Sequence, residues 1–270
     1  MSAPIWTTER WLDEAEAASI EYASYWNDVE TEADKPWNVA DGDFAKLERY
    51  LAQVGLPADL RVCLEAVGRP LGERGIDLAA GTLWAAPALL AAGPVQRLYC
   101  LEFSRHRLLE LGPRMLEHYG VAPERVVLAY GSFYDLHLDD DELDFAFLSQ
   151  AFHHADRPDA LLAELRRVLR PGGAAILVGE HVIRPRDYAV YGARALASLA
   201  PQRVRERLFA EPVEVRRTLR PSARDLFPTD PVLGDHAYDP ADYARLFSRA
   251  GFTWRRVRRK NGHYQGFVLT

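Results

Sequence analysis

Between Gly75 and Val182, apolar segments of strand length alternate with segments of helix length. The apolar runs GIDLA, RLYCLEFS, RVVLAYGSF, LDFAFLSQ and AAILVGEHV have the length of strands, and stretches such as RHRLLELGPRMLEHYG between them have the length of helices. Strands and helices that alternate in this way form a parallel sheet covered by helices on both faces. With two further strands expected near the C-terminus, we predict an α/β fold with a Rossmann-like, doubly wound, mostly parallel sheet of seven strands.

The segments that flank this alternation predict helices and a cap. From about Thr8 to Trp26, apolar and aromatic residues recur at helical spacing among acidic residues, which predicts an amphipathic helix. Near the C-terminus, Asp239 and Pro240 can begin a helix and Gly251 can end it, before two closing strands. We therefore expect an N-terminal helical lid (1–70), a Rossmann-like core that binds the cofactor (71–182), a helical cap insertion rich in Arg and Pro (183–237), and a C-terminal helix and strands that complete the sheet (238–270).

Composition restricts the partners of this chain of 270 residues. Its formal net charge of -6 argues against nucleic acid, because the neutralisation of phosphates needs a basic surface. It has only two cysteines, and no apolar run reaches membrane-spanning length. The N-terminal residues are acidic rather than basic and then apolar, unlike a secretory signal. We expect a cytoplasmic protein with no membrane or nucleic-acid partner, as a monomer or a homodimer.

The first turn of the alternating region favours a ligand without a phosphate. In doubly wound sheets, ligands lie outside the carboxyl ends of the strands, where the strand order reverses. Asp77 lies in the first strand, Gly81 lies in the turn, and Glu102 closes the second strand about 21 positions later. A carboxylate at that point can accept both hydrogen bonds of a ribose diol. A turn with one glycine, followed by the bulky Trp84, fits poorly with a pyrophosphate, which needs close approach to several backbone amides.

Four motifs in this order resemble those of the class I S-adenosylmethionine-dependent methyltransferases of the small-molecule type (methyltransferase type 11-like). They are IDLAAGT at the first turn, CLEFS with the acid, GSFYDLHLDDDELDFAFLSQAFHH over the third and fourth strands, and ELRRVLRPGGAAILVGEH before and along the fifth. The resemblance covers about Gly75 to His181, with a weaker match at YARLFSRAGF. The sequence departs from the usual first motif at Ala79 and Leu83, where the family has glycine.

The resemblance implies the cofactor S-adenosylmethionine, with S-adenosylhomocysteine as product, and a set of residues around it. Asp77 and Gly81 would lie by the methionine moiety, Glu102 would bind the ribose hydroxyls, and Ser132 and Phe133 would flank the adenine. Phe133 could equally be part of the core. The full set of cofactor-binding residues expected is Asp77, Ala79, Gly81, Glu102, Phe103, Ser132, Phe133, Ser149 and Gln150.

His153 and His154 follow the fourth strand and are the candidate catalytic residues. Histidine titrates near neutral pH and can take a proton from a hydroxyl, phenol or ammonium acceptor. A histidine pair in a turn can also be purely structural. Asp156 lies close to both in sequence, but no further ligand stands at a spacing that completes a shell, so no metal is expected.

The acceptor pocket of the family is built from the N-terminal helices and the segment after the fifth strand. The candidate acceptor residues are Tyr22, Trp26, Trp37, His181 and His236. The function expected is methyl transfer to an O, N or C atom of a small-molecule acceptor, with secondary metabolism as one setting. Two alternatives remain open: an enzyme that uses the same cofactor for cyclisation or another alkyl transfer, and a non-catalytic scaffold that keeps the fold.

Overall fold

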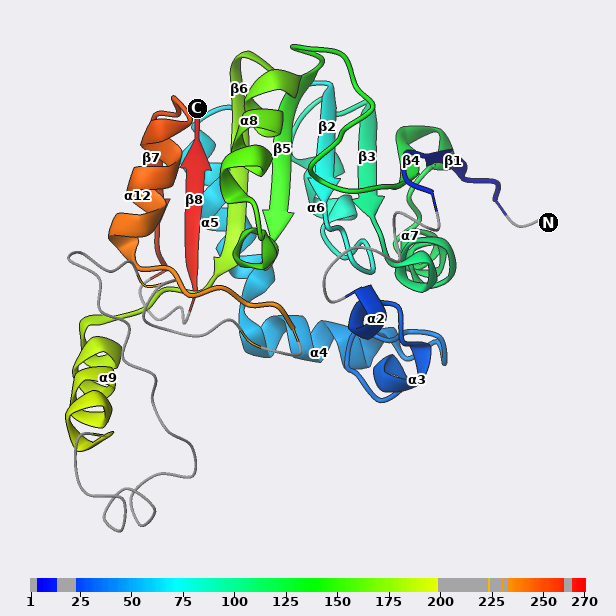
Figure 1. Ribbon diagram of the computed structural model, residues 1–270. Coiled ribbons are helices and arrows are strands. Elements are labelled where there is room, and N and C mark those ends of the chain that lie inside the picture. The colour runs from blue at the N-terminus through cyan, green and yellow to red at the C-terminus, as the bar shows by residue number, and fades with distance from the viewer. Residues whose placement is uncertain (1–3, 14–22, 199–222, 224–229, 231–232, 260–263) are drawn as a thin grey trace.

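The computed structural model describes residues 4–13, 23–198, 223, 230, 233–259 and 264–270. Its centre is an eight-stranded sheet with the strand order β1-β4-β3-β2-β5-β6-β8-β7 (Figure 1). All neighbouring strands are parallel except for β8, which runs antiparallel to both β6 and β7. The strands are β1 (Thr7–Arg10), β2 (Arg74–Leu78), β3 (Arg97–Glu102), β4 (Val126–Tyr130), β5 (Leu143–Ser149), β6 (Leu169–Glu180), β7 (Trp254–Val257) and β8 (Gln265–Leu269). The predicted α/β fold with a doubly wound, mostly parallel sheet is confirmed.

Helices cover both faces of the sheet, and each face has its own apolar core. Residues of β2 and β5 belong to both cores. Ile76 and Leu78 pack with α8 (Pro158–Val168) and α12 (Pro240–Arg249), whereas Phe145 and Phe147 pack on the other face with the helices from α4 (Phe44–Val54) to α7 (Gly112–His118). A strand buried on both faces needs apolar residues at every position, which explains the continuous apolar runs of the sequence. The helices are α2 (Ala23–Trp26), α3 (Val29–Glu32), α4 (Phe44–Val54), α5 (Leu56–Val67), α6 (Ala86–Ala91), the π-helix η1 (Arg107–Leu111), α7 (Gly112–His118), the 3₁₀ helices η2 (Pro123–Arg125) and η3 (Phe152–His154), α8 (Pro158–Val168), α9 (Pro185–Ser198) and α12 (Pro240–Arg249).

The N-terminal part of the chain differs from the prediction. Residues Thr7–Arg10 form β1, which pairs with β4 in parallel at one edge of the sheet, so the sheet has eight strands instead of seven. The Trp11 amide continues this pairing and donates a hydrogen bond to the Tyr130 carbonyl at 2.8 Å. The helix expected from about Thr8 is therefore wrong at its start. Residues 14–22 lie outside the described part of the chain, and Ala23–Trp26 is helical as expected.

The arrangement places several short helices across one end of the sheet. In Figure 1, α2, α3 and α4 lie below the ends at which β3 and β5 finish, which is where the parallel strands have their carboxyl ends. The strand order reverses at β2, which lies between β3 and β5. This is the position at which doubly wound sheets bind ligands.

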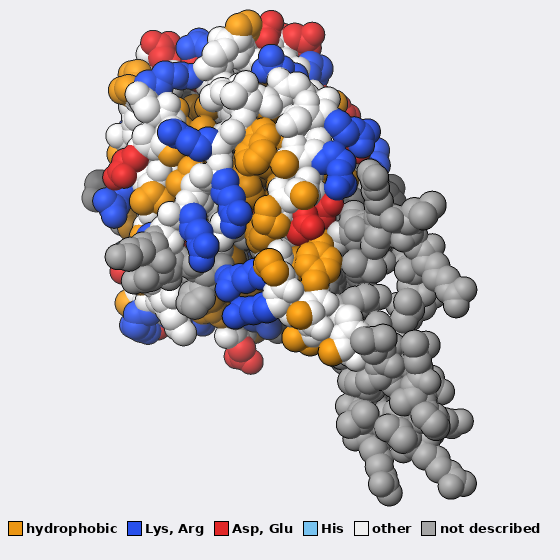
Figure 2. Space-filling model, turned by 90° about the vertical axis from the view of Figure 1, so that its left-hand side faces the viewer, with side chains coloured by type: hydrophobic (Ala, Val, Ile, Leu, Met, Phe, Trp, Pro, Cys, Tyr) orange, Lys and Arg blue, Asp and Glu red, His pale blue; other side chains and the backbone are white. Residues whose placement is uncertain are grey.

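The opposite edge of the sheet carries positive charge. Figure 2 shows basic side chains among apolar ones on the side of the molecule that holds β7 and α12. Arg255 and Arg256 stand exposed on β7 itself. Charged side chains on an edge strand oppose its pairing with another sheet.

None of the helices in the described part of the chain has both the length and the apolar character needed to cross a membrane.

Candidate active site

A cavity of about 300 Å³ opens at the carboxyl ends of β2, β3 and β5. Its floor is formed by the turn after β2 and the ends of β3 and β5, and α4 and the N-terminal segment contribute to its other walls. A volume of this size is at the lower end of the range that holds a small organic ligand.

The turn after β2 has an unusual backbone. Ala79, Gly81 and Leu83 all have positive φ angles, of 54°, 55° and 62°. Glycine adopts this conformation at little cost, whereas alanine and leucine do so against steric repulsion. The Leu83 side chain is fully buried and lies against Gly112, where an added Cβ would come within 2.9 Å of it. Leu83 thus points away from the cavity, among whose described lining residues it is not found.

Glu102 joins this turn to the end of β3. One of its carboxylate oxygens accepts a hydrogen bond from the Gly81 amide at 2.9 Å, and the other accepts from the amides of Phe103 and Ser104 at 2.9 and 3.0 Å. Glu102 is 3% exposed and lines the cavity. These bonds fix the carboxylate, and the oxygen bound to Gly81 has a lone pair left for a ligand hydroxyl.

Asp77 lies beneath this site rather than on the surface of the cavity. Its side chain is 2% exposed, and Asp77 is not among the described residues that line the cavity. Burial raises the pKa of Asp77 well above its ordinary value, and the nearby charge of Glu102 raises it further.

The other expected cofactor residues all line the cavity. Ser149 ends β5, and its hydroxyl oxygen is buried without a hydrogen-bond partner among the described residues, so it is free to bind a ligand. Gln150 follows with a φ of 50°, and its amide donates to the Val178 carbonyl at 2.8 Å. The lining residues that the sequence predicted for the cofactor are Ala79, Gly81, Glu102, Phe103, Ser132, Phe133, Ser149 and Gln150.

Both candidate catalytic histidines line the cavity, on η3 just past β5. His153 is 2% exposed, and its Nδ1 lies 2.8 Å from a carboxylate oxygen of the fully buried Glu180. Glu180 also accepts hydrogen bonds from the backbone amides of η3 and from the Tyr243 hydroxyl. Burial alone lowers the pKa of His153, but the carboxylates of Glu180 and Asp235 outweigh it, so the pKa of His153 lies above its ordinary value.

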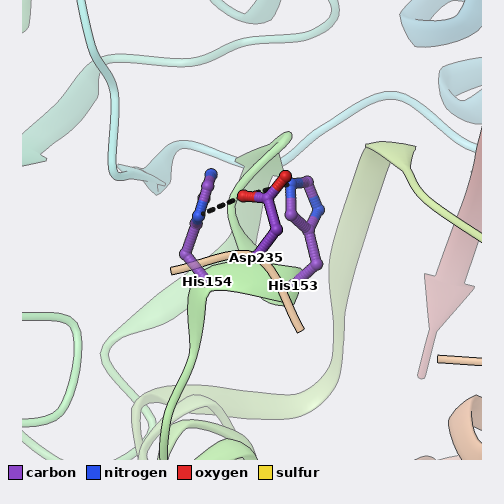
Figure 3. Close-up of side chains that lie close together, drawn as sticks. All are labelled: His153, His154 and Asp235. Carbon is purple, nitrogen blue, oxygen red and sulfur yellow. Dashed lines mark ion pairs between the residues drawn. The ribbon is translucent and has the colours of Figure 1, made fainter. Parts of the chain in front are cut away.

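A second carboxylate reaches the same histidines from a distant segment. Figure 3 shows Asp235 between His153 and His154. One Asp235 carboxylate oxygen, Oδ1, lies 3.0 Å from Nδ1 of His154 and 3.9 Å from Nε2 of His153. All three residues line the cavity.

The candidate acceptor residues fall into three groups. Trp26, Trp37 and His181 line the cavity, and the Trp26 ring meets the edge of His154 at a centroid distance of 5.2 Å. His236 is not among the described lining residues, but its Nε2 lies 2.9 Å from an oxygen of Asp156, which does line the cavity. Tyr22 lies outside the described residues.

The sequence did not single out the contact that holds the N-terminal segment over the cavity. Arg107 on η1 forms an ion pair with Glu32 of α3, and its guanidinium lies 4.8 Å from the Trp26 ring centroid and 5.7 Å from that of Trp37. Arg107 stands in a π-helical turn, a geometry that is frequent at functional sites. The proline at position 113 inside a helical pattern was the available sign of a disturbed helix.

Comparisons with known proteins find methyltransferases. Residues 76–177 match the family model described as "Methyltransferase domain". Demethylmenaquinone methyltransferase of Clavibacter sepedonicus is 37% identical over 112 residues, which is 42% of this chain and only 43% of the relative. The enzyme of the same name from Bacillus velezensis is 26% identical over 183 residues, 67% of this chain and 72% of the relative. The matched part thus spans less than half of the first relative's length.

Solved structures share the fold. A SAM-dependent methyltransferase from Aquifex aeolicus superposes with a TM-score of 0.50 at 17% identity, over 76% of this chain and 85% of that one. At this level of identity, the likeness concerns the fold alone.

Proposed function

We propose that this chain, whose residues 76–177 match a methyltransferase family model, is a class I S-adenosylmethionine-dependent methyltransferase that transfers a methyl group to an O, N or C atom of a small-molecule acceptor. The observation that carries the proposal is the hydrogen bond from the Gly81 amide to Glu102. It brings the turn after β2 and Glu102 at the end of β3 to the same wall of the cavity. The Glu102 carboxylate can still accept a further hydrogen bond from a ligand.

The residues present fit the cofactor. Glu102 can accept hydrogen bonds from the ribose hydroxyls, and the unpartnered Ser149 hydroxyl offers a further contact. The cofactor supplies an activated methyl group on a sulfonium, and the protein's part is to hold an acceptor in line with it and to exclude water.

The acceptor end of the cavity combines aromatic walls with imidazoles. Trp26 and Trp37 suit a planar or apolar acceptor, and His153 and His154 stand where an acceptor proton would be taken up or held. An acceptor screen therefore starts with ring compounds that carry an ionisable group. Demethylmenaquinone, which appears in the names of both relatives described above, is one of them.

A binding measurement tests the cofactor assignment. We expect titration calorimetry to show binding of S-adenosylmethionine and S-adenosylhomocysteine, and Glu102→Gln to weaken it by about 1–3 kcal/mol, roughly 5- to 150-fold, because the charge-assisted hydrogen bonds are impaired. Glu124→Gln is the matched control, since Glu124 is exposed on η2 at the opposite end of β4. Equal affinities of the two variants would refute the role of Glu102, and no binding to the parent protein would refute the proposal. Mass spectrometry of products separates methyl transfer from other uses of the sulfonium.

We place the protein in the cytoplasm, as a monomer or a homodimer that binds no nucleic acid. Its two cysteines, Cys63 and Cys100, are free and buried, which suits a reducing compartment. Burial raises the pKa of the Cys63 thiol to about 12, so this cysteine is a poorly reactive core residue.

A further inference from the structure

We infer that His153, His154 and Asp235 form a binding site for one divalent transition-metal ion at the acceptor end of the cavity (Figure 3). Each residue offers one ligand atom, and these atoms lie within 4.8 Å of one another. The sequence predicted no metal because the third ligand stands about 80 positions after the two histidines.

The distances suit an ion of the size of zinc. Asp235 Oδ1 lies 3.0 Å from His154 Nδ1 and 3.9 Å from His153 Nε2. An ion with bonds of roughly 2.0–2.1 Å separates neighbouring ligand atoms by about 3–3.5 Å. The longer of the two Asp235 separations must therefore shorten by about 0.5 Å, and the two histidine nitrogens, which lie within 4.8 Å of each other, must approach by at most about 1.3 Å.

The oxygen between the two imidazoles is placed to bind a cation. Asp235 Oδ1 is buried between the two imidazoles, and its only close polar contact among the described residues is the 3.0 Å ion-pair contact with His154 Nδ1, which falls short of good hydrogen-bond geometry. A buried carboxylate oxygen without a hydrogen bond is costly, and a metal ion would satisfy it. The His154 Nδ1 also lies 3.1 Å from the Leu233 carbonyl, and metal binding would replace the proton shared with that oxygen.

The residues behind the ligands have the arrangement that supports metal-bound histidine. Nδ1 of His153 lies 2.8 Å from a carboxylate oxygen of Glu180, and the other ring nitrogen, Nε2, is the one that lies near Asp235. A carboxylate behind a histidine fixes the ring orientation and raises its strength as a ligand. The His236 amide donates to the His153 carbonyl at 2.8 Å, so the segment that carries Asp235 is tied to η3 next to the site.

The ligand set indicates the class of ion. Two imidazoles and one carboxylate favour zinc, iron, cobalt or manganese over magnesium or calcium, which prefer all-oxygen shells. Three protein ligands leave positions open towards the cavity. Resting on the proposed function, the ion would bind the acceptor oxygen there and lower its pKa, so that the histidines act as ligands rather than as the base.

Cobalt titration tests the site directly. Protein freed of metal by a chelator is titrated with Co²⁺ and followed by visible absorption, with Zn²⁺ as competitor. We expect one Co²⁺ per chain, displaced by Zn²⁺, and a loss of affinity of at least about tenfold in both His154→Ala and Asp235→Asn. His137→Ala is the control, because His137 is half-exposed and is not among the described residues that line the cavity. No saturable binding, or equal affinity in all four proteins, would overturn the site.

Calorimetry with S-adenosylmethionine on the same proteins keeps the two proposals apart. Variants that bind the cofactor normally but have lost Co²⁺ are folded, and support the metal site. Parent protein that binds Co²⁺ but no cofactor would refute the proposed function and leave the metal site standing. Unchanged methyl transfer after complete removal of metal would overturn its catalytic role.

Discussion

Asp77 is a carboxyl group in the middle of a strand that is buried on both faces, with 2% of its surface exposed. Its pKa is raised by burial and then by Glu102, so the folded protein favours the protonated form. The contribution of protonated Asp77 to the free energy of unfolding is fully present below the pKa that Asp77 has in the unfolded chain, near 3.8. It is lost as the pH rises through the higher pKa that Asp77 has in the folded protein. At neutral pH, Asp77 therefore lowers the free energy of unfolding.

Replacing Asp77 by asparagine should remove this destabilisation, because asparagine has no carboxyl group to ionise. We expect Asp77→Asn to raise the free energy of unfolding near pH 8 by on the order of 1 kcal/mol, with little effect at about pH 4, in urea unfolding. Asp139→Asn, at an exposed position, is the control. A stabilised variant that binds S-adenosylmethionine more weakly would show that the charge is kept for the cofactor. Unaltered binding would refute the assignment of Asp77 to the cofactor.

In the first turn, the family has glycine where this chain has Ala79 and Leu83. Introducing glycine at these two positions should change the free energy of unfolding in opposite directions. Ala79→Gly relieves a left-handed backbone and should raise the free energy of unfolding by up to about 1 kcal/mol. Leu83→Gly relieves the same strain but deletes a fully buried side chain, so a net loss of roughly 1–4 kcal/mol is expected. Chemical denaturation of both variants checks this, and a shift of the same sign in both would contradict it.

At the scale of elements, an ion pair joins the short N-terminal helix α3 to the core. Glu32 is 2% exposed and binds Arg107, while the Trp37 indole donates to the same carboxylate at 3.3 Å. The pair joins α3 to η1, and Arg107 of η1 lines the cavity. That residues 1–70 form a lid stays a prediction, and this ion pair is the contact that we expect to attach it.

Removing the charge of Glu32 should weaken the packing of Trp26 and Trp37, which line the acceptor end of the cavity, against Arg107. We expect Glu32→Gln to cost about 3 kcal/mol of stability, because Arg107 is left buried without a counter-ion. It should also raise the KM for the acceptor more than the Kd for the cofactor, since Trp26 and Trp37 rest on the same guanidinium. Glu30→Gln, exposed two residues away, is the control. Matching stabilities and KM values in the two variants would contradict the attachment.

The core elements could be predicted from sequence because each follows from local pattern. The strands from β2 to β6 are continuous apolar runs, and Glu102 follows from its place at the end of one of them. Contacts between distant segments could not be predicted. Asp235 reaches His153 across about 80 residues, and β1 is recognised only through its partner β4, since its own four residues are mostly exposed.

At the scale of the whole molecule, the sheet should be less stable at its β1 edge than at its centre. The Trp11 amide bonds to Tyr130 at this edge, and the Ala80 amide bonds to Leu101 between two central strands. We expect hydrogen exchange at Trp11 to be at least about tenfold faster, because a short edge strand opens without global unfolding. Equal protection of the two amides would show that β1 unfolds only with the rest of the sheet.

The pairing of β1 with β4 also bears on the order in which the protein can be completed during its synthesis. Thr7 pairs with Val127, which the ribosome adds 120 residues later. At about 5–20 residues per second, this strand waits roughly 6–24 s for its partner. Over that interval, the backbone groups of β1 have only water or a chaperone to bind. The strand β1 is therefore synthesised early, but the sheet edge that it forms can be completed only late.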